Sequence, residues 1–195
     1  MPSIFPFSVS FTLMRRLIFS INMTLDGFCD HTDVIADEEL HEFANELLRN
    51  TDLVLFGRVT YELFEQYWPG LAKDQSGTVA ENEFARRIDD IDKIVFSKTL
   101  SNPKWKNTRV ISSNIDAEIR KLKKEKGRDM LILASPGIAS YLINHHLIDE
   151  YRISLQPIVS GKGKPLFGNN GKLDLELIGT KIFGSGVVVL NYIPG

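Results

Sequence analysis

The feature that most constrains the fold of this chain is a series of short, continuous apolar runs that alternate with longer segments of helical periodicity. Leu53 to Phe56 and Met130 to Ala134 are two such runs, while Asp37 to Asn50 places its apolar residues on one helical face. Uninterrupted apolar strands are typical of parallel sheets with helices on both faces. The sequence therefore predicts an α/β fold around a mostly parallel central sheet.

The expected elements follow one another along most of the chain. Strands are expected at Leu17 to Met23, Leu53 to Phe56, Lys93 to Ser97, Arg109 to Ser112, Met130 to Ala134 and Tyr151 to Val159. Helices are expected at Asp37 to Asn50, Val59 to Tyr67, Ala80 to Ile91, Asp116 to Lys126 and Gly137 to His146. The last two apolar runs, Leu173 to Phe183 and Val187 to Ile193, flank Gly184-Ser185-Gly186. This spacing predicts a C-terminal antiparallel hairpin.

Composition narrows the class of protein. The chain has 195 residues, a length that suits one domain, and its net charge of -2 gives no electrostatic reason to expect a nucleic-acid partner. No segment reaches the length of about 18 apolar residues that spans a membrane. A lone cysteine, Cys29, cannot form an intrachain disulfide, which indicates a reducing compartment such as the cytoplasm or a fold that needs no disulfide. No histidine or cysteine pattern predicts a metal site. Residues 1–13 carry no charge and are expected to form a tail of uncertain order before a domain at 14–195.

Candidate binding residues follow the expected strands, because ligands of such sheets bind at the carboxyl ends of the strands. At Gly57-Arg58-Val59-Thr60 a strand meets a helix. Gly57 permits close backbone approach, the helix start offers free N–H groups, and Arg58 and Thr60 add donors suited to phosphate. The alternative is an ordinary strand-to-helix turn with a surface arginine.

Two more corners have a similar composition. Ser97-Lys98-Thr99 follows one strand, and Ala134-Ser135-Pro136-Gly137-Ile138 joins another strand to a helix. The alternatives are an exposed loop at the first and a plain helix start at the second, with Ser135 as the N-cap. Three such corners at one sheet edge would suit a dinucleotide, although no GxGxxG pattern is present.

Two carboxylates and one loop are further candidates. Asp26 follows the first strand, and Glu39 lies near the start of the Asp37 to Asn50 helix, so either could supply a proton. Their alternative roles are closing a turn and stabilising the helix dipole. The basic loop at Gly161-Lys162-Gly163-Lys164 could touch a substrate through Gly161 and Gly163, or could simply be a mobile turn.

Together these motifs resemble the dihydrofolate reductase fold. Its Gly-Arg-x-Thr-Tyr-Glu and Ser-Lys-Thr-Leu segments read Gly57 to Glu62 and Ser97 to Leu100 here. Leu147 to Arg152 and Pro157 to Phe167 are most similar to the reductase domain of the bacterial riboflavin biosynthesis deaminase-reductase, in its stand-alone form. The resemblance covers Arg15 to Tyr192 and implies a three-layer fold with helices on both faces of the sheet.

The resemblance also implies a cofactor and residue roles. NADPH is expected, with Arg58, Lys98 and Ser97 near its 2′-phosphate, and a homodimer is expected, with the Tyr151 to Val159 strand as a candidate interface. Thr60, Ser135, Gly137 and Ile138 would hold the pyrophosphate region, and Ile21 and Asn22 would line the nicotinamide pocket.

The resemblance further implies hydride transfer to a C=N or C=O carbon of a small heterocyclic or ribosylated molecule, and a phosphoribosylamino-uracil is one option for this substrate. No deaminase domain accompanies the reductase motifs, and Ala134-Ser135 replaces the family's Gly-Gly or Gly-Ser corner. Two alternatives stay open: a non-catalytic nucleotide-binding protein that keeps the fold, and a folate reductase. The Leu-Pro-Trp pattern of folate reductases is missing, since Thr32 to Ala36 stands in its place.

Overall fold

The computed structural model describes residues 14–30, 32–168 and 170–195, so the expected tail at 1–13 lies outside the described residues. Within these residues the core is one eight-stranded sheet, in the order β4-β3-β2-β5-β1-β6-β8-β7. The strands are β1 (Leu17–Thr24), β2 (Thr51–Gly57), β3 (Asp92–Phe96), β4 (Thr108–Ile111), β5 (Asp129–Leu133), β6 (Glu150–Gln156), β7 (Leu175–Ile182) and β8 (Val188–Pro194). The first six run parallel, and β8 and β7 close the sheet antiparallel.

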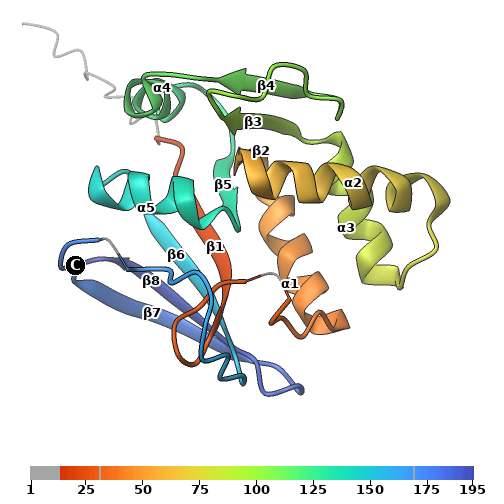
Figure 1. The fold of residues 1–195 in the computed structure, drawn as a ribbon, viewed down its shortest axis with the longest axis vertical. Helices are drawn as coiled ribbons and strands as arrows, with labels where there is room; N and C mark the ends of the chain where they lie inside the picture. The colour runs from red at the N-terminus through yellow and green to blue at the C-terminus, as the bar shows by residue number, and fades with distance from the viewer. Residues whose placement is uncertain (1–13, 31, 169) are drawn as a thin grey trace, which may run out of the picture.

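Helices cover both faces of this sheet, as Figure 1 shows. The helices are α1 (Glu38–Arg49), α2 (Arg58–Asp74), α3 (Val79–Asp90), α4 (Ile115–Leu122) and α5 (Pro136–Asn144). Helices α1, α2 and α3 bury their apolar residues in one hydrophobic cluster, and α4 and α5 bury theirs in a second cluster on the opposite face. The predicted three-layer α/β fold with a mostly parallel sheet and a C-terminal hairpin is confirmed.

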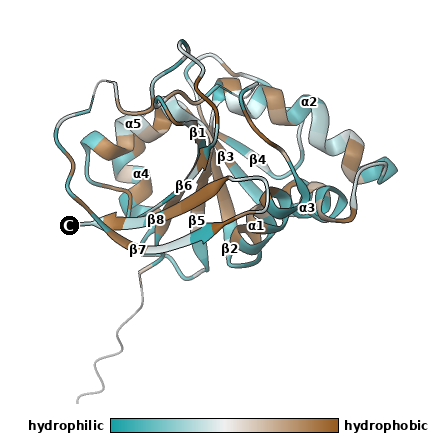
Figure 2. Ribbon diagram, turned by 90° about the horizontal axis from the view of Figure 1, so that it is seen from below, coloured by the Kyte–Doolittle hydropathy of each residue, from teal (hydrophilic) through white to brown (hydrophobic). Residues whose placement is uncertain are grey.

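The apolar strands are continuous because both of their faces are buried. On β2, Leu53 and Leu55 join the cluster of α4 and α5, whereas Val54 and Phe56 join the cluster of α1, α2 and α3. This alternation follows from the two-residue period of a strand. In Figure 2 the hydrophobic colour follows the strands and the helix faces that meet them. Burial on two sides thus explains the pattern that first indicated the fold.

Helix α2 is longer than the expected Val59 to Tyr67 segment and continues through Pro69 to Asp74. Proline inside a helix lacks the N–H for one backbone hydrogen bond. The helix nevertheless continues because its inward residues, Tyr61 before the proline and Leu71 after it, are both buried. Packing against the core therefore overrides the local break signal.

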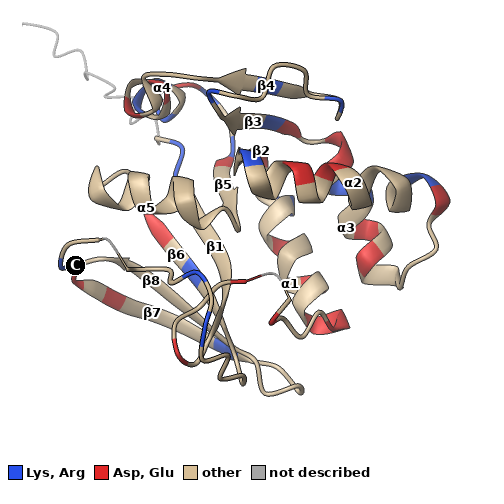
Figure 3. Ribbon diagram, viewed as in Figure 1, with Lys and Arg blue, Asp and Glu red and all other residues tan. Residues whose placement is uncertain are grey.

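The expected helix Asp116 to Lys126 is shorter in the structure and ends at Leu122. Helix α4 carries both acidic and basic residues (Figure 3), and Lys123 follows its last residue. Its side chain is buried, and its Nζ lies 2.6 Å from a carboxylate oxygen of Asp149. The ion pair compensates for the loss of water around the ammonium.

Strand β6 lies inside the sheet, between β1 and β8. Both of its backbone edges are hydrogen-bonded, so the expected Tyr151 to Val159 interface has no free strand edge to offer. The outer strand on this side is β7, where Leu177, Ile178 and Ile182 are at least half exposed. In the described part of the chain, no helix is long and apolar enough to cross a membrane.

Candidate functional site

The three predicted binding corners lie along one edge of the sheet, where the parallel strands end. Neighbouring strands β3, β2, β5 and β1 lead into Ser97, Gly57, Ala134 and Asn22, in that spatial order. A hydrogen bond joins two of the corners directly: the Gly57 N–H donates to Ser135 Oγ at 3.0 Å. Parallel pairing therefore gathers residues that are far apart in the sequence at one place.

Helices α2 and α5 begin at this edge without a side-chain cap. Ser135 occupies the N-cap position of α5, as the simpler interpretation expected, but its hydroxyl accepts from Gly57 instead of capping the helix. By contrast, Asp37 caps α1 and Thr78 caps α3. Uncapped first-turn N–H groups can donate to an anion.

The Ala134-Ser135 corner has a left-handed backbone at two successive non-glycine residues. Ala134 has φ 52° and Ser135 has φ 59°. A side chain in this region costs about 1–2 kcal/mol per residue because the Cβ crowds the carbonyl oxygen. The tight corner brings the start of α5 against Gly57, where an added Cβ would lie 3.9 Å from the side chains of Ser135 and Ile138.

Arg58, Lys98 and Ser97 lie on the exposed rim of the same edge. The Arg58 guanidinium forms an ion pair with Glu62 one turn along α2, with an Nη1–Oε2 distance of 2.8 Å. Ser97 Oγ accepts hydrogen bonds from the N–H groups of Thr99 and Leu100, which shapes the turn that carries Lys98. Lys98 is exposed, and Thr60 is half-buried in the first turn of α2.

The carboxylates of Asp26 and Asp30 hold the loop at Gly161 to Lys164 beside this edge through hydrogen bonds. Asp26 accepts from the Ser160 and Gly161 N–H groups, at 3.2 and 2.7 Å, and Asp30 accepts from the Lys164 N–H at 3.0 Å. Gly161 and Gly163 have φ values of +73° and +137°, which side chains rarely adopt. These glycines therefore have a backbone role in the loop, and nothing in the structure tests their predicted contact with substrate.

The same loop places the ammonium group of Lys164 near the start of α5. A Cβ placed on Gly137 would lie 3.6 Å from Lys164 Nζ. Lys164 thus stands over the uncapped end of the helix, together with Gly137 and the buried Ile138. Sequence reasoning named the loop but did not place its lysine at this corner.

The two carboxylates predicted as proton donors hold loops in place. The Thr24 hydroxyl donates to Asp26, and with the Gly161 and Ser160 N–H groups it lowers the pKa of Asp26 below its ordinary value. Glu39 Oε2 accepts from the Gly184 N–H at 2.6 Å and so ties α1 to the β7–β8 turn. Neither residue lines the cavity described next.

A cavity of about 280 Å³, here called the aromatic cavity, opens beside the ends of β1 and β5. Its floor comes from the sheet, and its walls come from α1, α2, α3 and the loop between β1 and α1. The floor residues are Ser20, Ile21, Asn22, Leu133 and Ser154 on strands, and Ala134 directly after β5. The predicted nicotinamide residues Ile21 and Asn22 therefore border this cavity.

Aromatic side chains form much of the wall of the aromatic cavity. Phe43, Phe64, Trp68 and Phe84 line it, and the Trp68 and Phe84 rings meet edge to face with centroids 4.5 Å apart. His41 also lines it, and its Nδ1 donates to the Asp37 carbonyl oxygen at 2.8 Å. This bond leaves Nε2 as the second polar atom of the ring. Such walls favour a flat, apolar ligand.

The floor carries most of the polar atoms. Asn22 Oδ1 accepts from Gln156 Nε2 at 3.1 Å, which leaves the Asn22 Nδ2 group to donate. Ser154 is paired with Asn22 across the β1–β6 register, and Ser20 lies two residues earlier on the same face. Sequence reasoning missed Ser20, Ser154, His41 and Trp68. The available signal was Ser20 within the apolar start of β1 and Ser154 between Ile153 and Leu155 of β6, at positions where burial of a hydroxyl needs a reason.

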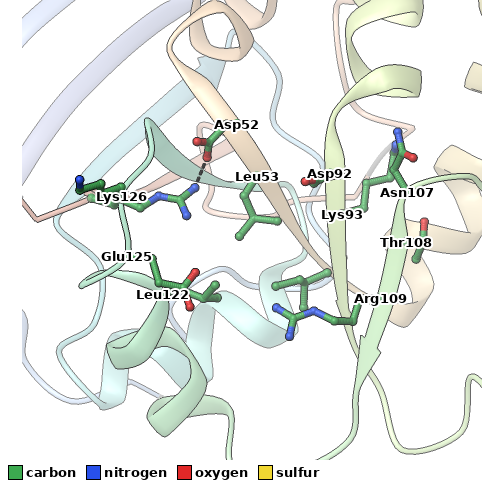
Figure 4. Close-up of a pocket in the computed structure, with 12 residues that line it drawn as sticks. Asp52, Leu53, Asp92, Lys93, Asn107, Thr108, Arg109, Leu122, Glu125 and Lys126 are labelled. Carbon is green, nitrogen blue, oxygen red and sulfur yellow. Dashed lines mark hydrogen bonds and ion pairs between the residues drawn. The ribbon is translucent and has the colours of Figure 1, made fainter.

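A larger cavity, of about 620 Å³, lies at the opposite edge of the sheet, where the parallel strands begin (Figure 4). Acidic and basic side chains line it together, including Asp52, Lys93, Arg109 and Lys126. Arg15 pairs with Asp52, and the Lys93 ammonium donates to the carbonyl oxygens of Asp89 and Ile91. Arg15, Asp52 and Lys93 are therefore engaged within the protein. None of the predicted site residues lies here, so size alone does not mark the functional site.

Comparison with known proteins decides the family. The sequence model of the RibD C-terminal domain matches residues 15–189. The chain belongs to the RibD C-terminal domain family. It is 33% identical over 184 residues to the uncharacterised protein YyaP of Bacillus subtilis (strain 168), covering 91% of this chain and 94% of that protein. The resemblance to the riboflavin biosynthesis reductase domain is thereby confirmed.

Solved structures share the fold. A candidate riboflavin biosynthesis protein from Shewanella sp. PV-4 matches with a TM-score of 0.69 and 20% identity, over 92% of this chain and 99% of that chain. The diaminohydroxyphosphoribosylaminopyrimidine deaminase/5-amino-6-(5-phosphoribosylamino)uracil reductase of Thermotoga maritima matches with a TM-score of 0.61 and 18% identity, over 93% of this chain and 57% of that chain. Membership of this RibD family supports an enzyme of the riboflavin-biosynthesis reductase type.

Proposed function

We propose that this protein is an NADPH-dependent reductase that transfers a hydride to a C=N or C=O carbon of a small heterocyclic or ribosylated molecule. The observation that carries the proposal is the meeting of two corners at the Gly57–Ser135 hydrogen bond, directly beside the aromatic cavity. A cofactor along the strand ends and a substrate in the cavity would then meet near Ile21, Asn22 and Ala134.

The chemistry of the donors fits this cofactor. Two helices present uncapped N-termini, and Arg58, Lys98 and Lys164 add positive charge beside them. Phosphate groups are stabilised by both features. Arg58 and Lys98, with Ser97, would hold the 2′-phosphate, while Thr60, Ser135, Gly137 and Ile138 would border the pyrophosphate. When bound, NADPH supplies the hydride.

The role of the protein in the chemical step is mainly positioning. The hydrogen bond from Gln156 fixes the side chain of Asn22. The amide N–H group of Asn22 would then orient the nicotinamide ring or the substrate ring by donating to it. The aromatic walls would keep bulk water away from the reacting carbon, because most of the cavity surface is apolar, and would leave the polar floor as the place for a single bound water. We propose that water supplies the proton, since Asp26 and Glu39 are both committed to backbone N–H groups outside the cavity.

We also propose that two copies associate in the cytoplasm. The unpaired edge of β7 and its exposed Leu177, Ile178 and Ile182 offer an apolar surface for this contact. The free thiol of Cys29 is compatible with a reducing compartment.

The experiment that tests the cofactor assignment is a calorimetric titration with NADPH, with NADH as the control. We expect NADPH to bind more tightly, and the Arg58→Ala variant to lose much of the difference. Consumption of NADPH in the presence of a substrate would then separate a reductase from a protein that only holds the nucleotide. Absence of binding by both nucleotides would refute the proposal.

A further inference from the structure

Two serines on the floor of the aromatic cavity have hydroxyls that form no hydrogen bond with another described residue. Ser20 is 6% exposed and Ser154 is 2% exposed, and both line the cavity. Because they line the cavity, their hydroxyls can donate to and accept from a bound ligand. The floor of the cavity therefore offers hydrogen-bonding groups to the polar atoms of a ligand.

The polar residues of the floor are neighbours on one face of β1 and β6. Asn22 and Ser154 are side by side on neighbouring strands, and Ser20 continues the same face of β1. Above them stand the rings of Phe64, Trp68 and Phe84. A molecule that satisfies both surfaces is flat, with hydrogen-bonding atoms on one edge and apolar faces.

The lining of the cavity does not favour a phosphate. Among the described residues, neither lysine nor arginine lines it, and its one carboxylate is that of Asp30. Burying a phosphate here would leave its charge without a cation and near a like charge, which is strongly unfavourable.

We infer that the substrate is an uncharged, flat heterocycle without a phosphate, held by Asn22, Ser154 and Ser20 at its polar edge and by Trp68 at its face. This inference rests on the proposed function in treating the occupant of the cavity as the substrate. It distinguishes this chain from the Thermotoga maritima neighbour, whose name specifies a phosphoribosylamino-uracil reductase.

A matched pair of probes tests the inference by calorimetry. The first is 4-methylumbelliferone, a flat bicyclic ring with a polar edge, at a pH that keeps it uncharged. The second is 4-methylumbelliferyl phosphate, in which the phosphate replaces the hydrogen of the ring hydroxyl. The 7-methyl ether of the parent ring lacks the same hydrogen without a charge and is the control for its loss. We expect the phosphate to bind at least about tenfold more weakly, because its charge has no partner in the cavity.

Variants locate the binding. Ser154→Ala is expected to weaken the binding of 4-methylumbelliferone about fivefold through loss of one hydrogen bond. Trp68→Leu removes a ring from the wall and is expected to weaken it further. Ser113→Ala, which alters an exposed hydroxyl between β4 and α4, is the matched control and is expected to leave the affinity unchanged.

Three results would overturn the inference. The first is that 4-methylumbelliferyl phosphate binds as tightly as 4-methylumbelliferone. The second is that neither probe binds. The third is that Ser154→Ala and Trp68→Leu both bind 4-methylumbelliferone with the affinity of the wild type. The NADPH titration in the same samples reports separately on the proposed function. Loss of nucleotide binding with retained preference for the uncharged ring would refute the reductase assignment alone.

Discussion

The N–H of Gly57 donates a hydrogen bond to Ser135 Oγ at 3.0 Å and so joins the ends of β2 and β5. The two residues are 78 positions apart in the sequence. The bond sets the spacing between the starts of α2 and α5, the two uncapped helices at the proposed cofactor site. Its removal is therefore expected to affect stability and nucleotide binding together.

Ser135→Ala removes the acceptor of this bond and keeps the size of the side chain close to that of serine. We expect stability to fall by about 1 kcal/mol, because the Gly57 N–H loses its partner. Affinity for NADPH is also expected to fall. Urea denaturation and calorimetry measure the two effects. A variant with unchanged stability and unchanged affinity would show that the bond does not hold the corner.

Ala134→Gly tests the strain at the same corner. Ala134 has φ 52°, where glycine lacks the Cβ that crowds the backbone. We expect stability to rise by about 1 kcal/mol, and NADPH to bind more tightly since the methyl group is gone. Ala139→Gly, inside α5, is the matched control and is expected to lower stability by about 1 kcal/mol. Destabilisation by both substitutions would contradict the strain argument.

Glu62→Gln frees Arg58 from its ion pair on α2. The guanidinium is then available to the 2′-phosphate, and a like charge beside that phosphate is removed. We expect about twofold tighter binding of NADPH, since an exposed pair of this kind contributes only a few tenths of a kcal/mol. The gain should shrink at high salt and be absent for NADH. Equal gains in affinity for NADPH and NADH would mean that the 2′-phosphate does not lie near Arg58.

Asp26→Asn tests the fastening of the 160–161 loop through its pH dependence. The pKa of Asp26 is lower in the folded protein than its ordinary value of 3.8, so ionisation favours the folded state. This stabilisation is complete above the ordinary pKa and is lost as the pH falls through the lowered value. We expect thermal stability of the wild type to drop more than that of the variant on acidification from about pH 5 to about pH 2.

Glu176→Gln, which changes an exposed carboxylate on β7, serves as the control for Asp26→Asn. It should follow the wild-type profile throughout the acid range. Identical acid profiles for wild type and Asp26→Asn would mean that Asp26 contributes nothing to the loop.

Ile182→Asp places a charge on the exposed edge strand β7, where Ile182 is 73% exposed. If two copies meet at this edge, the buried charge should weaken the dimer and leave the fold of each copy intact. Light scattering measures the mass and circular dichroism checks the fold. A wild type that is monomeric, or a variant that stays dimeric, would exclude this interface.

Most of the fold could be predicted from the sequence, because the patterns that indicate its strands, helices and turns are local. Strands β2 and β5 are apolar on both faces, and the Gly184 to Gly186 turn marks the closing hairpin. The binding corners were also visible, since glycine, hydroxyl and cationic residues follow the strands. The local sequence gave the wrong end for α2, because Pro69 normally ends a helix. Burial of Leu71 stabilises the part of α2 that follows the proline.

The sequence by itself determined the layers of this protein and the residue types at its strand ends, because both depend on periodicity and on neighbours along the chain. Only the tertiary structure decided that Asp26 and Glu39 hold loops, that Lys164 stands over the start of α5, and that Ser20 and Ser154 lie without protein partners beneath a ring of aromatic side chains. Such relationships join residues from distant segments. They are set by strand order and helix packing, which no single segment encodes.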